Sequence, residues 1–221
     1  MQQLFVVTPM ILGVTHAFDA DHIAAVSALV IGSKDPWRAV RLALIWGIGH
    51  MIPLLAVTAV GLGIGLGPVV PPWAADLLER SVGVMMLLLG GMTLLGMRAR
   101  GIHVHAHSHD GIPHVHFHAH RSERGNHEHT HAAVLTGAVH GLAGSGAAIA
   151  LVPLGATHAA SELLLFVATF GASVAAAMSV YAFCLGRLSV ALGERSRTLV
   201  LVLRASSGLA CMSIGGVWMA T

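Results

Sequence analysis

Charged residues are scarce in this chain of 221 residues: Asp, Glu, Lys and Arg make up only 10% of it, whereas hydrophobic residues make up 55%. A soluble domain carries about 25% charged residues, so the composition argues against a water-soluble globular protein. Three stretches, residues 42–75, 132–161 and 163–186, contain no Asp, Glu, Lys or Arg. Each is at least as long as the ~20 apolar residues that an α-helix needs to cross a bilayer. The sequence therefore predicts an all-α integral membrane protein.

Other absences narrow the function. The two cysteines, Cys184 and Cys211, fall within apolar segments, which indicates neither a disulfide framework nor a Cys-based zinc cluster. The formal net charge of +2 is too small to indicate nucleic-acid binding. The sequence has no G-x-x-x-x-G-K-[ST] motif, so ATP is not expected to drive the protein. The predicted membrane segments contain no H-E-x-x-H motif, so we do not expect an enzyme.

Apolar runs predict six membrane helices, at residues 4–31, 38–66, 77–97, 132–154, 160–186 and 198–219. The apolar start lacks the features of a cleaved signal peptide, and we interpret it as the first membrane helix. A polar segment divides the chain into a three-helix unit (1–97), a His-rich loop (98–131) and a second three-helix unit (132–221). Arg and Lys gather between helices one and two, three and four, and five and six. The positive-inside rule then predicts a multi-pass protein of the cell's inner (cytoplasmic) membrane, with a cytoplasmic His-rich loop and both termini outside.

The two units resemble each other at a nearly constant offset. Three helices per unit is an odd number, so the second copy must enter the membrane from the opposite face. This is the inverted-repeat plan of many transporters, in which the substrate site lies near the midplane of the bilayer. The matched residues are Gly13 with Gly137, His16 with His140, Gly47 with Gly171, Ser81 with Ser206, and Gly90-Gly91 with Gly215-Gly216.

The most informative segment lies in the first predicted helix and contains His16, Asp19, Asp21 and His22. Each Asp at the centre of a membrane helix costs roughly 2.5–3.5 kcal/mol, and a bound divalent cation would offset that cost. On a regular helix Asp21 would point away from the other three side chains, so we expect the helix to be broken here. Imidazole nitrogen with carboxylate oxygen suits Ni(II), Co(II) or Zn(II). The alternative is that these residues only lie near the outer water interface.

The string His16-Ala17-Phe18-Asp19-Ala20-Asp21-His22 resembles the H-x4-D-H signature of the nickel/cobalt transporter family. The string from His140 to Gly146 is similar to the second-half motif of the urease-accessory-type relatives in that family. The resemblance implies that the His and Asp residues of the first motif select the metal. Trp46-Gly47-Ile48-Gly49-His50 is similar to the family's second-helix motif, which adds His50 to the predicted metal residues.

The second half of the pathway is less well marked. His140 is the repeat partner of His16, but the second copy has lost the acidic residues, and Ser145 remains there as a weak ligand. His50 and His140, each taken alone, are also compatible with hydrogen-bonded helix packing.

Eleven of the sixteen histidines lie in residues 102–131. In an extended strand, alternate residues share one face, and the Asp110–Pro113 stretch between the first two blocks has turn chemistry. His-rich tracts bind metals through neutral imidazole, so the loop is predicted to buffer metal, although without metal it is expected to be disordered. The alternative is an inert solvated linker. The eleven residues are His103, His105, His107, His109, His114, His116, His118, His120, His127, His129 and His131.

Together these features predict a secondary transporter that moves Ni(II) or Co(II) across the lipid bilayer and carries no cofactor. Uptake is favoured and efflux is the alternative, since a long His-rich loop also occurs in related exporters; Zn(II) is not excluded by ligand chemistry. Three roles are open for the loop: to store ions, to gate the pathway, or to deliver ions to a cytoplasmic metallochaperone or a urease or hydrogenase maturation factor. A membrane metalloenzyme and a metal sensor anchored by its helices are the rival functions.

Overall fold

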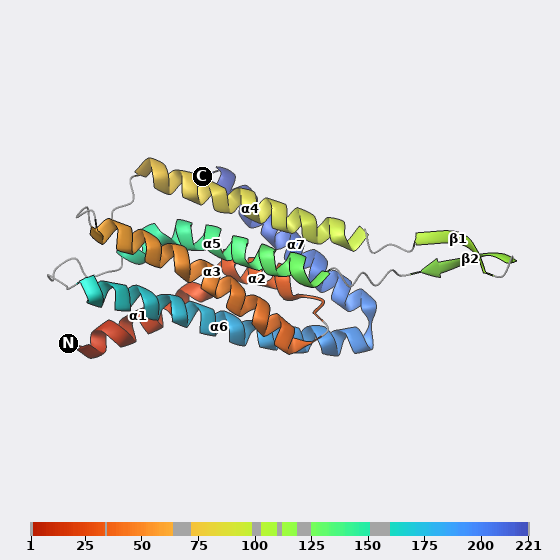
Figure 1. Cartoon of the computed structure of the whole chain (residues 1–221), viewed down its shortest axis with the longest axis horizontal. Coiled ribbons are helices and arrows are strands. Elements are labelled where there is room, and N and C mark those ends of the chain that lie inside the picture. Colours follow the sequence, from red (N-terminus) through yellow and green to blue (C-terminus); the bar gives the residue numbers. More distant parts are fainter. Residues whose placement is uncertain are drawn as a thin grey trace.

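The computed structural model describes residues 2–33, 35–63, 72–98, 103–109, 112–118, 125–150 and 160–220. Within these ranges the chain forms seven helices and one β-hairpin (Figure 1). In chain order the elements are α1 (Gln2–Ala17), α2 (Ala20–Val30), α3 (Pro36–Gly63), α4 (Pro72–Arg98), β1 (His103–His109), β2 (Ile112–His118), α5 (Gly125–Ala150), α6 (Ala160–Arg195) and α7 (Arg197–Ala220).

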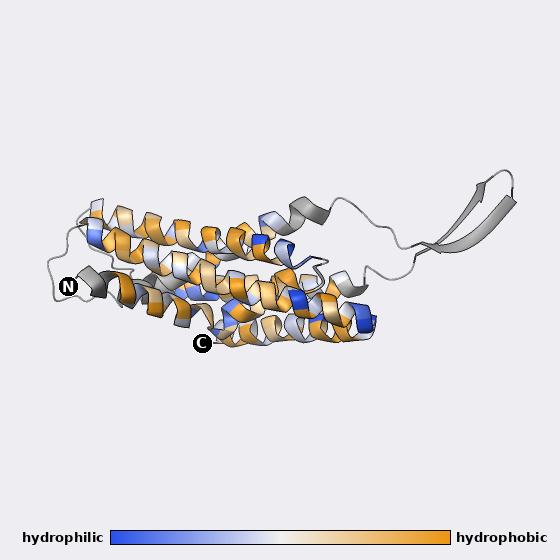
Figure 2. Cartoon of the chain, turned by 90° about the horizontal axis from the view of Figure 1, so that it is seen from below, coloured by the Kyte–Doolittle hydropathy of each residue, from blue (hydrophilic) through white to orange (hydrophobic). Residues whose placement is uncertain are grey.

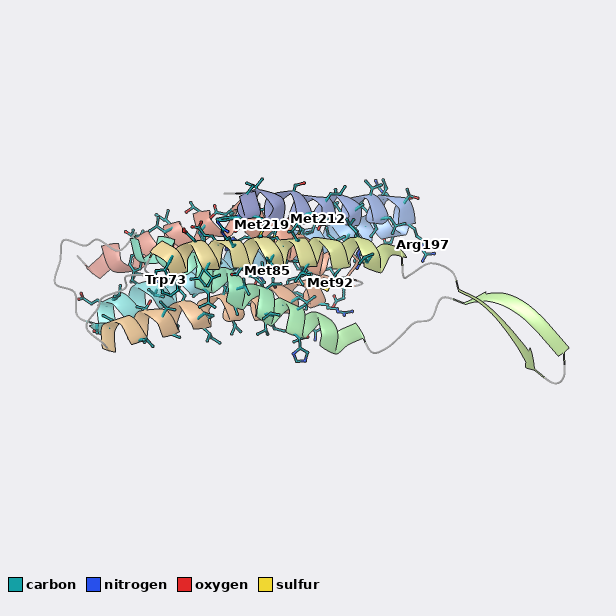
Figure 3. The ribbon with its side chains drawn as sticks, turned by 90° about the horizontal axis from the view of Figure 1, so that it is seen from above. Trp73, Met85, Met92, Arg197, Met212 and Met219 are labelled. Carbon is teal, nitrogen blue, oxygen red and sulfur yellow. The ribbon has the colours of Figure 1, made fainter. Side chains whose placement is uncertain are left out.

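The helices form an elongated bundle in which α3 is central. It packs against both α5 and α6, while α4 packs against α7 and α1 against α6. The hairpin connects α4 to α5 at one end of the bundle, the N-terminus lies at the other end, and the C-terminus lies near the middle of its length (Figure 1). Arg197, at the junction of α6 and α7, lies at the hairpin end (Figure 3).

In the described part of the chain, four helical segments are long and apolar enough to cross a membrane: Pro36–Gly63, Asp76–Gly96, Ala160–Arg195 and Arg197–Ala220. The two shorter apolar helices α1 and α2 follow one another directly. Hydrophobic residues recur along the helices of the bundle (Figure 2). Many large hydrophobic side chains are exposed, and the exposed fraction reaches 72% for Trp73 and 66% for Val180. A surface of this kind is rare on soluble monomers and fits the predicted membrane protein.

The first predicted helix is broken at Phe18 and Asp19, inside the motif where the sequence predicts a break. Asp19 is extended, with φ −61° and ψ 147°, and stands at the N-cap position of α2. The amides of Phe18 and Asp19 donate to the carbonyl oxygens of Thr15 (3.1 Å) and His16 (3.0 Å), so the last turn of α1 is tightened. The break therefore leaves His16 at the end of one helix and His22 in the first turn of the next.

Glycines let helices of the two halves approach closely at matched positions. A Cβ on Gly13 would lie 2.5 Å from the carbonyl oxygen of Phe170, and a Cβ on Gly137 would meet the carbonyl oxygen of Trp46 in the same way. Phe170 follows Trp46 by the same 124 positions that separate Gly137 from Gly13, so one contact occurs twice. Two further contacts also occur twice. Gly47 meets Ala175 as Gly171 meets Met51, and Gly90 meets Gly208 as Gly215 meets Gly83.

The predicted end of the fifth helix, residue 186, was too early. Helix α6 continues to Arg195, so Arg187 and Arg195 lie on this helix and only Ser196 separates it from α7. The extension is held in place because the Oγ of Ser189 accepts a hydrogen bond (3.0 Å) from the backbone N–H of Gly32. Gly32, with φ +85°, forms the turn that follows α2.

The start of the fourth predicted helix is also corrected, because α5 begins at Gly125 and not at residue 132. Asn126 and Glu128 in its first turn are residue types that favour a helix N-terminus. His127, His129 and His131 consequently lie on a helix, where alternate residues do not share a face.

The remaining described part of the His-rich segment forms an antiparallel hairpin rather than the metal-free disorder expected from its composition. Backbone pairing between β1 and β2 supplies a ladder of hydrogen bonds that does not depend on an apolar core. Directly opposed positions share one face of the hairpin. Three cross-strand pairs consist of histidine on both strands: His103 with His118, His105 with His116, and His107 with His114. His120 lies outside the described residues.

Candidate metal site

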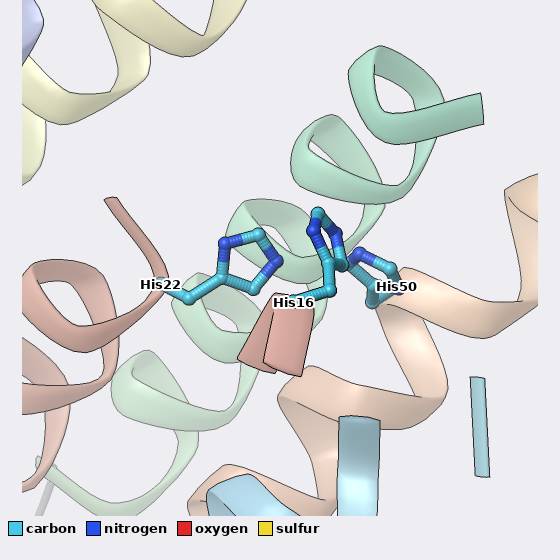
Figure 4. Close-up of side chains that lie close together, drawn as sticks. All are labelled: His16, His22 and His50. Atoms are coloured by element: carbon cyan, nitrogen blue, oxygen red, sulfur yellow. The ribbon is translucent and has the colours of Figure 1, made fainter. Parts of the chain in front are cut away.

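Four histidine rings meet beside the break between α1 and α2. His16 comes from the last turn of α1, His22 from the first turn of α2, His50 from the middle of α3 and His140 from α5. Figure 4 shows the first three side chains close together. The ring centroids lie 4.5 Å apart for His16 and His22, 5.8 Å for His16 and His50, 5.4 Å for His22 and His50, and 4.8 Å for His22 and His140. His22, His50 and His140 are each at most 2% exposed.

Small residues on α3 and α5 allow this convergence. A Cβ on Gly141 would meet the carbonyl oxygen of His50, and a Cβ on Gly49 would lie 2.6 Å from the carbonyl oxygen of Val134. The backbones of the two helices therefore nearly touch where each carries its histidine. The glycines next to His50 and His140 thus allow the two histidines to come close to each other.

Two aspartates orient two of the rings. The Nδ1–H of His16 donates to Oδ2 of Asp19 at 2.8 Å, and the Nδ1–H of His22 donates to Oδ1 of Asp21 at 3.0 Å. An ionised carboxylate can only accept, so the ring proton is on Nδ1 and the lone pair is on Nε2. This carboxylate–histidine pairing is the outer-shell arrangement that is typical of metal-binding imidazoles.

His140 is oriented by the backbone of its own helix. Its Nδ1–H donates to the carbonyl oxygen of Thr136 at 3.1 Å, which leaves the lone pair on Nε2. That Nε2 lies 3.5 Å from Oδ2 of Asp21. Both atoms are acceptors in this state, so only a proton or a cation between them would make the contact favourable.

Several buried nitrogens of the cluster therefore lack a hydrogen-bond partner. In the described part of the chain these are Nε2 of His16, His22 and His140, both nitrogens of His50, one of which is a donor, and the indole N–H of Trp46. Each unsatisfied buried polar group costs on the order of 1–3 kcal/mol. A divalent transition-metal ion would satisfy several of these acceptors at once.

The ligand atoms fall into two groups of three. We call His16, His22 and His50 the first position, and Asp21, His22 and His140 the second position; within each group the ligand atoms lie within 4.8 Å of one another. His22 belongs to both groups. Among the described residues Asp19 belongs to neither, since its side chain is 56% exposed and contacts His16 instead. The side chain of Ser145 lies outside the described part of α5.

Asp21 has additional support from the backbone. Its Oδ1 also accepts the backbone N–H of His22 at 2.9 Å, in the first turn of α2. Free N–H groups and the helix dipole stabilise a negative charge at a helix N-terminus. The break in the first helix thus provides a place where a carboxylate can be ionised inside the bundle.

Trp46 packs against the histidine cluster, although it is not among the predicted metal residues. Its ring is fully buried and lies 5.2 Å from His22, 5.4 Å from His50 and 5.6 Å from His140. Trp46 comes four residues before His50 on α3, so the two side chains share one face of the helix. This spacing is the signal in the sequence that could have indicated the contact. Phe170, the repeat partner of Trp46, packs in the same way on His16 at 5.3 Å.

The fold and the site define an apolar helical bundle with helices long enough to span a membrane and a cluster of histidines that could hold a metal ion. Over 176 residues the chain is 31% identical to the urease accessory protein UreH of Bacillus sp. (strain TB-90), an alignment that covers 80% of this chain and 73% of the relative. No family model matches the chain, and no solved structure matches it. The chain belongs to the UreH family of urease accessory proteins. The predicted urease-accessory branch is thereby confirmed, and the relative's name agrees with the prediction that the chain is not an enzyme.

The geometry predicts that Asp19 positions His16 and does not ligate the ion. Asp19→Ala should weaken Co(II) binding by about 10–100-fold, the usual effect of removing an outer-shell partner. Asp19→Asn keeps an acceptor oxygen and should weaken binding less. Equilibrium titration of the purified protein with Co(II) measures both effects. Loss of binding in Asp19→Ala as complete as in His22→Ala would show that Asp19 is itself a ligand.

Proposed function

We propose that the chain is a secondary transporter that carries Ni(II) or Co(II) across the cytoplasmic membrane. The observation that carries this proposal is the group of buried Nε2 lone pairs that converge beside the break between α1 and α2. A transported ion must leave its hydration shell, and imidazole nitrogens at this depth replace the lost water ligands. Metal here is the cargo, and the protein needs no resident cofactor.

The donor set supports a transition metal as the substrate. Imidazole nitrogen suits Ni(II), Co(II) and Zn(II), whereas Mg(II) prefers oxygen ligands and gives up its water reluctantly. The relative is named a urease accessory protein, which favours a role in nickel handling. We therefore propose Ni(II) as the main substrate, with Co(II) as a close second.

The proposed transport mechanism is alternating access between two inverted units. The six spans would be α1 with α2 as one broken helix, followed by α3, α4, α5, α6 and α7. Matched contacts such as Gly13 on Phe170 and Gly137 on Trp46 support the repeat, because they relate the two halves by a constant offset. Rocking of one unit against the other would expose the site to each side in turn.

The proposed orientation places both termini outside and the His-rich segment in the cytoplasm. Arg38, Arg195 and Arg197 support it, since they lie at the ends of α3, α6 and α7 and the positive-inside rule assigns helix ends rich in Arg to the cytoplasm. Uptake is proposed over efflux on the resemblance of the first motif to uptake permeases. Ions entering through the site would then meet the histidine segment on arrival, from which a metallochaperone or a urease or hydrogenase maturation factor would collect them.

Proteoliposomes that contain the purified protein test the function. They should accumulate radioactive Ni(II), and His22→Ala and His50→Ala should reduce the flux to that of protein-free vesicles, because each removes a ligand of the first position. His131→Ala is the matched control: this exposed histidine lies outside both positions, and its flux should be unchanged.

A large excess of Mg(II) at constant ionic strength should leave the flux unaltered. Absence of Ni(II) and Co(II) flux in the unaltered protein would refute the proposal. Flux only in the outward direction, measured in vesicles of known orientation, would retain the site and replace uptake with efflux.

We further propose that the histidine segment buffers metal on the cytoplasmic side. The register of β1 and β2 supports this, because opposed residues have Cβ atoms about 4.5–5.5 Å apart, a spacing at which two imidazoles can hold one ion. Three such pairs follow one another along the hairpin.

Replacing the eleven histidines of residues 102–131 with Asn should leave transport in place and lower the number of ions bound per chain by more than one. Equilibrium dialysis with Ni(II) measures the bound metal, and vesicle flux measures transport. The difference from the unaltered protein should fade below about pH 6, where imidazoles bind protons instead of metal. Complete loss of flux in the substituted protein would place these histidines on the obligatory route.

A further inference from the structure

We propose that the ion occupies two positions in succession, and that His22 hands it from the first position to the second. The inference rests on the proposed transport function and adds a second metal site, formed by Asp21, His22 and His140. The ion would leave His16 and His50 as it gains Asp21 and His140.

The shared ring makes the two positions exclusive. While Nδ1 of His22 donates to Asp21, Nε2 carries the only free lone pair of that ring, and Asp21 exchanges this hydrogen bond for the ion when the second position fills. One lone pair binds one ion at a time. The ring of His22 lies between the others, at 4.5 Å from His16 and 4.8 Å from His140, so a small movement exchanges one set of partners for the other.

The second position is built for a cation. Oδ2 of Asp21 and Nε2 of His140 lie 3.5 Å apart as two acceptors, and their side chains are only 15% and 1% exposed. The orientation of both groups is fixed by other contacts: His140 by the carbonyl oxygen of Thr136, and Asp21 by the backbone N–H of His22. The carboxylate also brings a negative charge, which the first position lacks. This charge compensates for the smaller number of imidazole ligands at the second position, so the two positions hold the ion about equally well and it can pass between them.

The repeat gives the movement a direction. His140 follows His16 by the repeat offset of 124, and each ring packs against an aromatic partner, Trp46 or Phe170, that obeys the same offset. Equivalent residues of inverted repeats approach the midplane from opposite sides. Transfer from the ring of one unit to the ring of the other is therefore a step along the transport axis.

The test uses Co(II) binding and Ni(II) flux in a full-length parent protein whose loop histidines are replaced by Asn, so that only the membrane positions bind metal. His50→Ala removes a ligand of the first position alone, and His140→Gln removes one of the second alone. The parent should bind one Co(II) per chain. His140→Gln should keep one Co(II) with an affinity within about threefold of the parent, yet lose about tenfold or more of the flux.

His50→Ala should still bind one Co(II), more weakly, and this ion should disappear in the double variant His50→Ala/His140→Gln. Parent-like flux in His140→Gln would overturn the inference, because the second position would then be off the pathway. Loss of Co(II) binding together with flux in a monodisperse, helical His140→Gln protein would also overturn it, since all four rings would then form one site. If that variant does not fold, Asp21→Asn poses the same question, because it removes the charge of the second position and keeps every ring.

The outcome separates this inference from the proposed function. A parent protein without any Ni(II) or Co(II) flux would refute transport. The binding pattern of the single and double variants would still decide whether the second position exists.

Discussion

Buried imidazoles whose lone pairs face one another are the constraint on which the rest of this structure depends. Buried groups of this kind need a partner from the protein or a bound ion, and among the described residues no side chain donates to Nε2 of His16 or His22. The arrangement is unfavourable unless a cation binds, so the unsatisfied nitrogen atoms favour metal binding. Asp19, Asp21 and Thr136 make this possible, because each fixes the proton on the outer nitrogen of a ring.

The break between α1 and α2 is the structural feature that permits the site. A continuous helix would direct Asp21 away from His16, whereas the extended backbone at Asp19 allows His16 and His22 to converge on His50. The break also creates a helix N-terminus inside the bundle, which stabilises the charge of Asp21. Glycines on α3 and α5 then bring His50 and His140 into the same space. The chemistry and the packing therefore depend on the same short segments.

Much of this site follows from the sequence, and particular residues show where such reasoning stops. Paired Asp and His in an apolar run predict both the break and the metal, and the offset of 124 links His140 to His16. Sequence could not assign Asp19 to an orienting role, because ligand and outer-shell carboxylates have the same spacing along the chain. The contacts of Trp46 depend on helix packing that no local pattern specifies. The boundary of α6 was misjudged because the contact of Ser189 with Gly32, which supports the extra turns, joins residues far apart in the chain.

The central claim is that imidazole nitrogens of this cluster hold the transported ion. Cobalt-edge X-ray absorption of the protein with its loop histidines replaced by Asn, loaded with less than one Co(II) per chain, tests it most directly. The account predicts the outer-shell scattering of two to three imidazole rings, the numbers of histidines in the second and first positions. A cobalt ion surrounded only by oxygen ligands, or no bound cobalt at all, would contradict it.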